Sequence, residues 1–508
     1  MFKNVITTRK AVNPPIGLAT IAALTPQDWE ISILDENIEP VDWNADADVV
    51  AVGGMSVQYK RQIEILDGFR RRGCYVVAGG SFASLCPERY AGYADTVIVG
   101  EAETIWPEFC ADVAARRPRA VYTKKDDVAL SLSPTPRHDL LKWSNYLTGS
   151  IQFSRGCPYR CEFCDIIVMF GRKPRIKSLD QIERELDALR AQDVHNVVFV
   201  DDNLIGHPAA CKKLLEFLVD YQRRHRYRFV FGAEATINAA DHPDILRLMR
   251  EANFAWLFIG IESPDEAALK ETRKLQNLRR DQLDSIKTIY SYGIDVFGGF
   301  IVGFDADDAS VFERQLRFII DAGIIIAMAG MLMAPPRTPL YERLLKVGRL
   351  KSTEVDENTL INSGLATNIV PLNMTQEELS AGVADLHRRL LDDRNIYLRL
   401  ANKLSYLGPS PNYTFRPDEW AIIIFGLVSR GIIPGGPRRW MYFLRSIVVA
   451  MRRPLLFPNM VPTLVANWAY ALSLRDYVDQ RLRVSAPEPR EPRLVPLGTA
   501  IAGEERRS

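Results

Sequence analysis

Short apolar runs alternate with helix-forming stretches along the first 350 residues of this 508-residue chain. One block of alternation covers residues 16–114, and a second begins at Ile151 after a polar segment interrupted by prolines. Strands that alternate with helices fold as parallel sheets covered by helices. Because the chain is too long for one ordinary core, the pattern predicts two α/β domains and a different architecture after Leu350.

The boundaries follow from where this pattern changes. We expect residues 1–125 to form a doubly wound, Rossmann-like domain whose first strand is short or missing, and residues 126–149 to form a connector. Residues 150–350 hold six strand-like runs separated by helical segments, which predicts a partial (β/α)6 barrel of the TIM type. Residues 351–482 are expected to be mainly helical, and residues 483–508, rich in Pro, Glu and Arg, to be a disordered tail.

Three cysteines stand in the run SRGCPYRCEFCDI, directly after the first strand of the second block: Cys157, Cys161 and Cys164. A CxxxCxxC spacing lets one tight loop hold three corners of an iron–sulfur cube, whose four irons are normally all held by thiolates. The fourth iron would be open to a substrate or cofactor, which favours a catalytic site. A structural zinc site is disfavoured, because it needs four ligands and no His or Cys follows closely enough.

Composition excludes some classes of protein. The 64 Lys and Arg residues are balanced by 63 Asp and Glu residues, so no overall field attracts nucleic acid. The scattered cysteines do not form a disulfide framework and residues 1–10 lack an apolar signal segment, which predicts a cytoplasmic protein. The longest apolar runs are shorter than the roughly 20 residues that cross a bilayer. Arginines and aromatic residues mixed over residues 430–457 fit a packed helical domain, the simpler interpretation, or peripheral contact with a membrane.

Polar residues follow several strand ends on the barrel face that would carry the cysteine loop. The set comprises Asp201, Asp202, Asn203, Glu234, Glu262 and Ser263, with Val302 and Gly303 at the end of another strand. Ser263 also fits a helix N-cap, because Pro264 would occupy the first helical position and Glu266 lies three residues on. Two adjacent acids followed by an amide exceed what a cap needs, which favours a functional role for residues 201–203.

The first block carries small and polar residues where its strands end. These are Ser56, Gly79, Gly80, Ser81, Gly100 and Glu101. Ligands bind at the carboxyl ends of strands in open α/β sheets, and glycine lets the backbone approach them. Taken alone, Gly79 and Gly80 are more typical of an ordinary turn after a strand than of a binding site.

The run CPYRCEFC resembles the cluster motif of the radical S-adenosylmethionine (radical SAM) superfamily, including the aromatic Phe163 before the third cysteine. The first block resembles the cobalamin (B12)-binding domain that precedes many radical SAM barrels, through PPIGLATIAAL, VVAGGSFAS and TVIVGEAE. The region after about Gly348 resembles the helical extension of a subgroup that includes the hopanoid C-2 methylases. The resemblance implies three cofactors, which are a [4Fe-4S] cluster, SAM and cobalamin.

The resemblance also implies a role for each candidate residue. Cys157, Cys161 and Cys164 would ligate three irons, and SAM would bind the fourth. SAM would contact Phe163, Asp201, Asp202, Asn203, Glu234, Glu262, Ser263, Val302 and Gly303, with residues 301–304 beside the adenine. Cobalamin would contact Ser56, Gly79, Gly80, Ser81, Gly100 and Glu101, and without a DxHxxG motif no histidine is expected below the cobalt.

Arg337 stands where the family tends to have glycine. The turn at PPRTPLY therefore cannot rely on the freedom of glycine at positive φ. We expect either a different turn or a contact between Arg337 and the substrate.

The implied reaction is reductive cleavage of SAM to a 5′-deoxyadenosyl radical, followed by methylation of an unactivated carbon through methylcobalamin. The substrate would be hydrophobic, isoprenoid- or hopanoid-like, or a natural-product scaffold, and a flavodoxin- or ferredoxin-type protein would supply electrons. Two alternatives stay open on the sequence. One is a cobalamin-binding radical SAM cyclase or oxidoreductase without methyl transfer, and the other is a non-catalytic iron–sulfur or cobalamin sensor.

Overall fold

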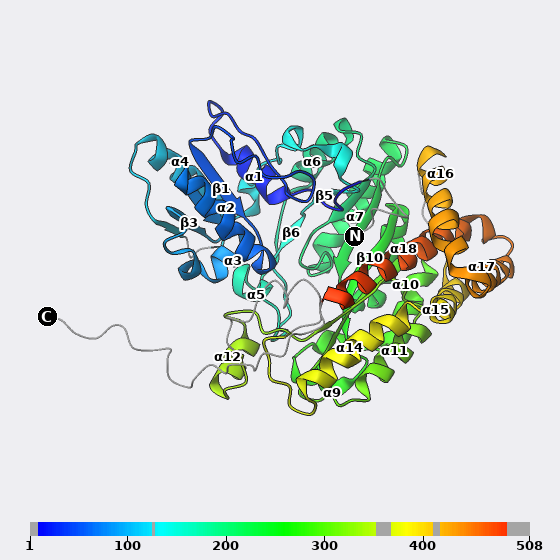
Figure 1. Ribbon diagram of the computed structural model, residues 1–508. Helices are drawn as coiled ribbons and strands as arrows, with labels where there is room; N and C mark the ends of the chain where they lie inside the picture. The colour runs from blue at the N-terminus through cyan, green and yellow to red at the C-terminus, as the bar shows by residue number, and fades with distance from the viewer. Residues whose placement is uncertain (1–8, 124–126, 352–366, 410–416, 485–508) are drawn as a thin grey trace.

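The computed structural model describes residues 9–123, 127–351, 367–409 and 417–484. Figure 1 shows an N-terminal α/β unit in blue, a barrel in cyan to green, and the last helices of the chain, in orange to red, on the side of the barrel away from the N-terminal unit. Most of the tail expected at residues 483–508 lies outside the described residues, and the last helix continues through Val484.

Four parallel strands form the N-terminal sheet in the order β1-β2-β3-β4. They are β1 (Val49–Gly53), β2 (Tyr75–Gly79), β3 (Thr96–Val99) and β4 (Val121–Thr123). Helices cover both faces: α2 (Tyr59–Arg71) and α3 (Gly80–Leu85) on one, α1 (Ile16–Leu24) and α4 (Ala102–Ala114) on the other. Alternate strand residues point to opposite faces, so Val76 and Ala78 pack with α2 and α3 whereas Val77 packs with α4.

Parallel strands with helices on both faces agree with the Rossmann-like class that we expected for this unit. The four described strands follow one another across the sheet in chain order. The first strand was expected before Pro14, where residues 1–8 lie outside the described residues. Residues 31–35 do not pair as a strand.

Six parallel strands form the barrel wall in the order β12-β11-β10-β9-β8-β5, which confirms the partial (β/α)6 barrel. The strands are β5 (Gly149–Ile151), β8 (Asn196–Phe199), β9 (Val230–Ala235), β10 (Phe254–Glu262), β11 (Asp295–Val302) and β12 (Ala327–Met331). The outer layer consists of α6 (Leu179–Ala191), α7 (Pro208–Arg224), α8 (Pro243–Glu251), α10 (Gln282–Ser291) and α11 (Val311–Asp321).

Exposure alternates along the central barrel strands. Side chains that face the outer helices are fully buried, as Leu257, Ile259 and Val296 illustrate. The intervening residues on the interior side stay accessible, and Met328, the second residue of β12, is 56% exposed. The barrel interior is therefore open, unlike the filled interior of a closed eight-stranded barrel.

The C-terminal region is helical, as expected. It contains α12 (Pro339–Lys346), α14 (Gln376–Leu390), α15 (Asp393–Tyr406), α16 (Pro417–Gly426), α17 (Gly436–Met451) and α18 (Phe457–Val484). Buried Arg399 on α15 donates to the carbonyls of Ile324 (3.1 Å) and Ile325 (2.9 Å), which ties these helices to the barrel. Within the described residues, none of the helices combines the length and apolar character needed to cross a bilayer.

Two buried arginines join the barrel to the N-terminal unit. Arg155 in β6 (Ser154–Arg155) pairs with Glu101 at 2.5 Å and with Glu103 at 2.9 Å, and Arg175 in β7 (Arg175–Ile176) pairs with Glu101 at 2.7 Å. Glu101 is the N-cap residue of α4 and Glu103 lies in its first turn, where the helix dipole favours negative charge. Burial alone would lower the pKa of Arg155, but the two glutamates raise it, so the network stays charged.

Arg337 makes a second, exposed link between the two units. Its φ of 65° is the left-handed conformation that glycine would adopt there, so the expected change of turn is wrong. The conformation costs roughly 1 kcal/mol for a residue with a side chain. The guanidinium lies 3.4 Å from Glu88 of the N-terminal unit, and both side chains are largely exposed.

Replacing Arg155 with Met should destabilise the protein by about 3–5 kcal/mol, because it leaves two carboxylates buried with only one guanidinium. Arg337→Ala is the matched control, since it also removes an arginine between the two units, and an exposed pair contributes about 0–1 kcal/mol. Urea unfolding of both variants measures the difference. Equal losses for the two would contradict the role given to the buried network.

Candidate active site

The cysteine loop runs from β6 to α5 (Ile166–Met169) and closes tightly on itself. Gly156 begins it with a φ of 98°, and a Cβ there would lie 3.1–3.2 Å from three backbone carbonyl oxygens of residues 170–173. The Gly156 amide donates to Asp202 at 2.7 Å, and the Cys157 amide donates to the Gly171 carbonyl at 3.3 Å. Glycine is needed at this position for the loop to fold back.

Asp201 anchors the start of this loop. Its buried carboxylate accepts hydrogen bonds from the backbone amides of Phe153 (3.1 Å) and Ser154 and from the Ser154 hydroxyl (2.6 Å). Burial raises the pKa of Asp201 to about 7, although these hydrogen bonds oppose the shift. Both carboxylate oxygens of Asp201 thus accept hydrogen bonds from the chain itself.

Three polar groups lie beyond Asp201. Burial raises the pKa of Asp202, and the buried amide nitrogen of Asn203 has no hydrogen-bond partner in the described structure. Glu234 is accessible to solvent yet surrounded by protein, and burial together with the nearby charge of Asp202 raises its pKa to about 7. An unpaired amide donor beside carboxylates suits an amino-acid group, so these residues could hold the methionine end of SAM.

The thiols differ in burial and in their partners. Cys161 is buried and its sulfur lies 3.6 Å from the Gln276 amide nitrogen. Burial raises the pKa of Cys157, and it raises that of Cys164 to about 12, so metal binding must displace the thiol protons. Among the described residues no three His, Cys, Asp or Glu side chains converge as a single ion requires. Three thiols on one loop, none of them in a disulfide, fit separate corners of a cluster instead.

A buried ion pair lies beside the thiols. Glu262 ends β10 at a φ of 63° and pairs with Lys274. Any side chain at Gly260 would clash with both charged groups, so glycine makes room for the pair. Burial lowers the pKa of Lys274, but Glu262 and Cys161 raise it above its usual value, and its ammonium lies 5.8 Å from the ring centre of Phe163.

The remaining strand ends close around the loop. Ser263 is not the N-cap of α9 (Glu266–Glu271), because Asp265 caps that helix by accepting from the Ala267 amide at 2.8 Å. The capping interpretation was therefore wrong by two residues, and the buried Ser263 hydroxyl accepts from the Asp265 amide at 3.1 Å. After β11, fully buried Val302 leads to Gly303, whose amide donates to Asp307 at 2.9 Å.

The turn after β11 also reaches the cysteine loop. The ring centres of Phe304 and Phe163 are 6.5 Å apart, so the structure brings residues 301–304 next to the third cysteine. These contacts join the two ends of the barrel domain, which are far apart in the chain.

The expected cobalamin residues meet at one edge of the N-terminal sheet. A Cβ on Gly80 would lie 2.7 Å from the backbone nitrogen of Gly54, so only glycine fits there. The Ser84 hydroxyl donates to the Gly80 carbonyl (2.8 Å) and accepts from the Gly100 amide (3.0 Å), which joins the ends of β2 and β3. Ser56 and Ser81 complete an edge of small residues. Small residues of this kind suit a large ligand that is held mainly by backbone groups. The Glu101 carboxylate is already paired with Arg155 and Arg175.

Several site residues were missed by sequence reasoning. The missed residues are Ser84, Glu103, Arg155, Arg175, Lys274, Gln276 and Asp307. Lys274 and Gln276 lie in ALKETRKLQNLRR, whose charges look like those of any solvated helix. Among the missed residues, Arg155 was the one that the sequence could have indicated, because it stands directly before the glycine of the cysteine loop.

These features define an iron–sulfur enzyme with a second cofactor domain at its barrel mouth. Three family models match successive parts of the chain. They are the B12 binding domain at residues 3–109, the radical SAM superfamily at residues 151–319, and a domain of unknown function (DUF4070) at residues 338–483.

Individual relatives support the same assignment. The hopanoid C-2 methylase of Rhodopseudomonas palustris is 41% identical over 347 residues, which are 67% of this chain and 66% of that protein. An uncharacterized methyltransferase of Synechocystis sp. is 39% identical over 365 residues, 70% of this chain and 67% of that protein. The matched part thus spans about two thirds of each relative.

A solved structure shows the same fold. The radical SAM methyltransferase TsrM of Kitasatospora setae, with cobalamin and a [4Fe-4S] cluster bound, superposes with a TM-score of 0.62 at 15% identity, covering 83% of this chain and 100% of TsrM. The chain belongs to the radical SAM superfamily, in the group that carries an N-terminal B12-binding domain. Its cofactors are a [4Fe-4S] cluster, SAM and cobalamin.

Gln276→Met should make the reduction potential of the reconstituted cluster more negative, because hydrogen bonds to cluster-bound sulfur favour the reduced, more negative state. Redox titration followed by electron paramagnetic resonance measures the shift. Gln222→Met is the control, since the Gln222 amide nitrogen donates only to the backbone carbonyls of Phe229 and Ala252. An unchanged potential in Gln276→Met would show that this amide does not act on the cluster.

Proposed function

We propose that this protein is a cobalamin-dependent radical SAM methyltransferase that methylates an unactivated carbon of a hydrophobic, polycyclic isoprenoid. The observation that carries the proposal is the position of the three-cysteine loop. It lies at the mouth of an open barrel and is held to the B12-binding domain by buried ion pairs. The 41% identity to a hopanoid C-2 methylase supports the substrate class.

In this proposal each group of residues has its own task. Cys157, Cys161 and Cys164 hold three irons, and Asn203 with Glu234 binds the amino-acid part of SAM. When bound, the three cofactors supply the electron, the hydrogen-abstracting group and the methyl group. Lys274 places a positive charge beside the thiolates, which offsets part of their repulsion.

The remaining SAM and cobalamin contacts are proposed at the strand ends described above. For SAM these are Phe163, Asp202, Glu262, Ser263, Val302 and Gly303, with Asp201 holding the loop in place. For cobalamin they are Ser56, Gly79, Gly80, Ser81 and Gly100, with Glu101 positioning the domain through its ion pairs.

The register of the barrel strands supports an apolar substrate. Glu234, Phe258 and Phe297 are neighbours in one row across the sheet. The next row toward the mouth contains Gly260, Gly299 and Met328. Gly260 makes room for the Glu262–Lys274 pair and Gly299 for the Phe258 ring. The accessible Met328 therefore lies beside aromatic rings, which suits a flat hydrocarbon.

A substrate of this kind partitions into lipid bilayers, so we place the enzyme at a membrane surface. We further propose that a flavodoxin- or ferredoxin-type protein delivers the electrons. Its donor group would approach the cysteine loop, where Cys157 and Cys164 are only partly buried.

Cys161→Ala should reduce formation of 5′-deoxyadenosine from SAM to background, because the cluster loses one of its three protein ligands. Anaerobic reconstitution, product chromatography and iron and sulfide content measure this outcome. Cys74→Ala is the control, because Cys74 lies in the N-terminal unit directly before β2, and it should keep full activity. Retained cleavage in Cys161→Ala would exclude the cluster assignment, and absence of cleavage by the unaltered enzyme would favour a sensor.

A further inference from the structure

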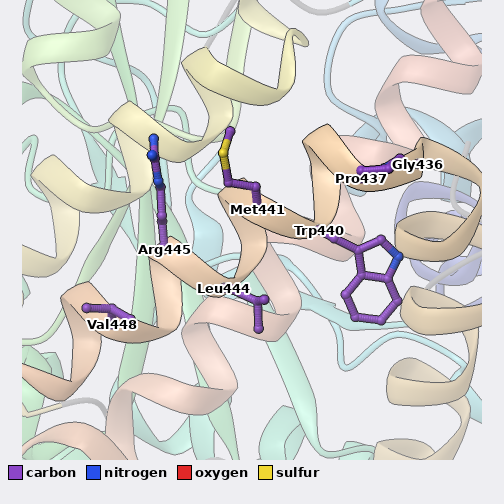
Figure 2. A pocket seen from close by; sticks show the side chains of 7 residues that line it. All are labelled: Gly436, Pro437, Trp440, Met441, Leu444, Arg445 and Val448. Atoms are coloured by element: carbon purple, nitrogen blue, oxygen red, sulfur yellow. The ribbon is translucent and has the colours of Figure 1, made fainter.

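The outer face of α17 is a row of exposed apolar side chains. Trp440, Leu444, Val448 and Met451 follow one another at helical spacing, and Leu444 and Val448 are 53% and 55% exposed. Leu455, in the turn after the helix, is 92% exposed. Figure 2 shows a shallow hollow along this helix, lined by residues 436–448. We call residues 440–455 on this face the α17 surface.

The opposite face of α17 is packed. Ser446 and Ala450 are fully buried, and the Ser446 hydroxyl accepts from the indole nitrogen of Trp468 at 3.2 Å. Eleven of the 25 large apolar side chains exposed in the described residues lie between Ile422 and Val461. An apolar concentration of this kind marks an interaction surface.

Charge distinguishes this surface from the rest of the chain. From Trp420 to Arg475 the sequence contains seven Arg and neither Lys, Asp nor Glu, whereas the whole chain has a net charge of only +1. Arg439 turns inward to Asp393. Arg445 and Arg452 are exposed, and among the described residues neither pairs with a carboxylate.

A second copy of the chain does not suit this surface. A symmetric contact would bring Arg445 and Arg452 close to the same two arginines of the second copy. No acidic residue of this surface would neutralise their charges. A bilayer with anionic headgroups satisfies both features, since it accepts apolar side chains at the headgroup boundary and attracts arginine.

We propose that the α17 surface docks the enzyme on an anionic phospholipid bilayer, with the helix lying in the plane of the membrane. Trp440, Leu444 and Val448 enter the headgroup boundary, and Arg445 and Arg452 contact lipid phosphates. The inference deepens the membrane location given above, but it rests on the side chains of this surface and not on methyl transfer. In Figure 1 the B12-binding domain lies at the far end of the molecule from α17 and faces away from such a membrane.

Vesicle flotation of the full chain tests the proposal. The protein should float with vesicles of phosphatidylcholine mixed with phosphatidylglycerol, more weakly with phosphatidylcholine alone, and less at high salt. The double variant Leu444→Glu with Val448→Glu should lower partitioning by at least about tenfold, because two apolar contacts become charged. Arg445→Gln and Arg452→Gln should each lower it about fivefold on the mixed vesicles.

Val121→Glu with Leu132→Glu is the matched control, because both are exposed apolar residues away from α17 and should leave flotation unchanged. All variants should keep wild-type 5′-deoxyadenosine formation without vesicles, so that lost flotation is separated from lost folding or lost chemistry. Failure of the unaltered protein to float, or flotation of the Leu444→Glu, Val448→Glu variant at the wild-type level, would overturn the proposal. A dimer that this variant dissociates would overturn it too and assign the surface to a second copy.

Discussion

The buried network of Arg155, Arg175, Glu101 and Glu103 determines where the two cofactor domains meet. Arg155 is separated from Cys157 only by Gly156, and Glu101 follows closely on the end of β3, so one ion pair joins the cysteine loop to the edge of the N-terminal sheet. Desolvating four charged groups is costly. Short contacts and the N-terminal dipole of α4 offset that cost. The network thereby fixes the position of the cysteine loop relative to the N-terminal unit.

Around this joint the chain uses its polar groups for structure as well as for chemistry. Asp201 holds the start of the cysteine loop and Asp202 holds Gly156, whereas the buried amide nitrogen of Asn203 has no hydrogen-bond partner in the described structure. The first two of these three neighbouring residues therefore shape the loop, and the third is the one that we propose binds SAM. In β10 and β11, Gly260 makes room for the buried Glu262–Lys274 pair and Gly299 for the ring of Phe258.

The alternation of strands and helices was sufficient to predict the partial barrel, and the resemblance of CPYRCEFC to a known motif predicted the radical SAM family. Both signals are local in the sequence. The spacing of the cysteines is set within one loop, and the period of the hydrophobic residues is set within one strand or helix. The glutamate partners of Arg155 precede the connector between the two domains, and Lys274 follows the cysteine loop only after β8, β9 and β10, so no local pattern revealed them. Only the alternative that Ser263 is an N-cap was wrong, because a cap depends on where the helix begins, and α9 begins later than SPDE suggested.

The central claim is that the cysteine loop and the B12-binding domain act together to transfer a methyl group. Anaerobic incubation of the reconstituted enzyme with a reductant, hydroxocobalamin, an isoprenoid lipid extract and SAM carrying a deuterated methyl group tests it most directly. Mass spectrometry should find 5′-deoxyadenosine together with a lipid that has gained the labelled methyl group. Sustained formation of 5′-deoxyadenosine with a lipid that is altered but carries no added methyl group would contradict the claim and indicate a cyclase or oxidoreductase.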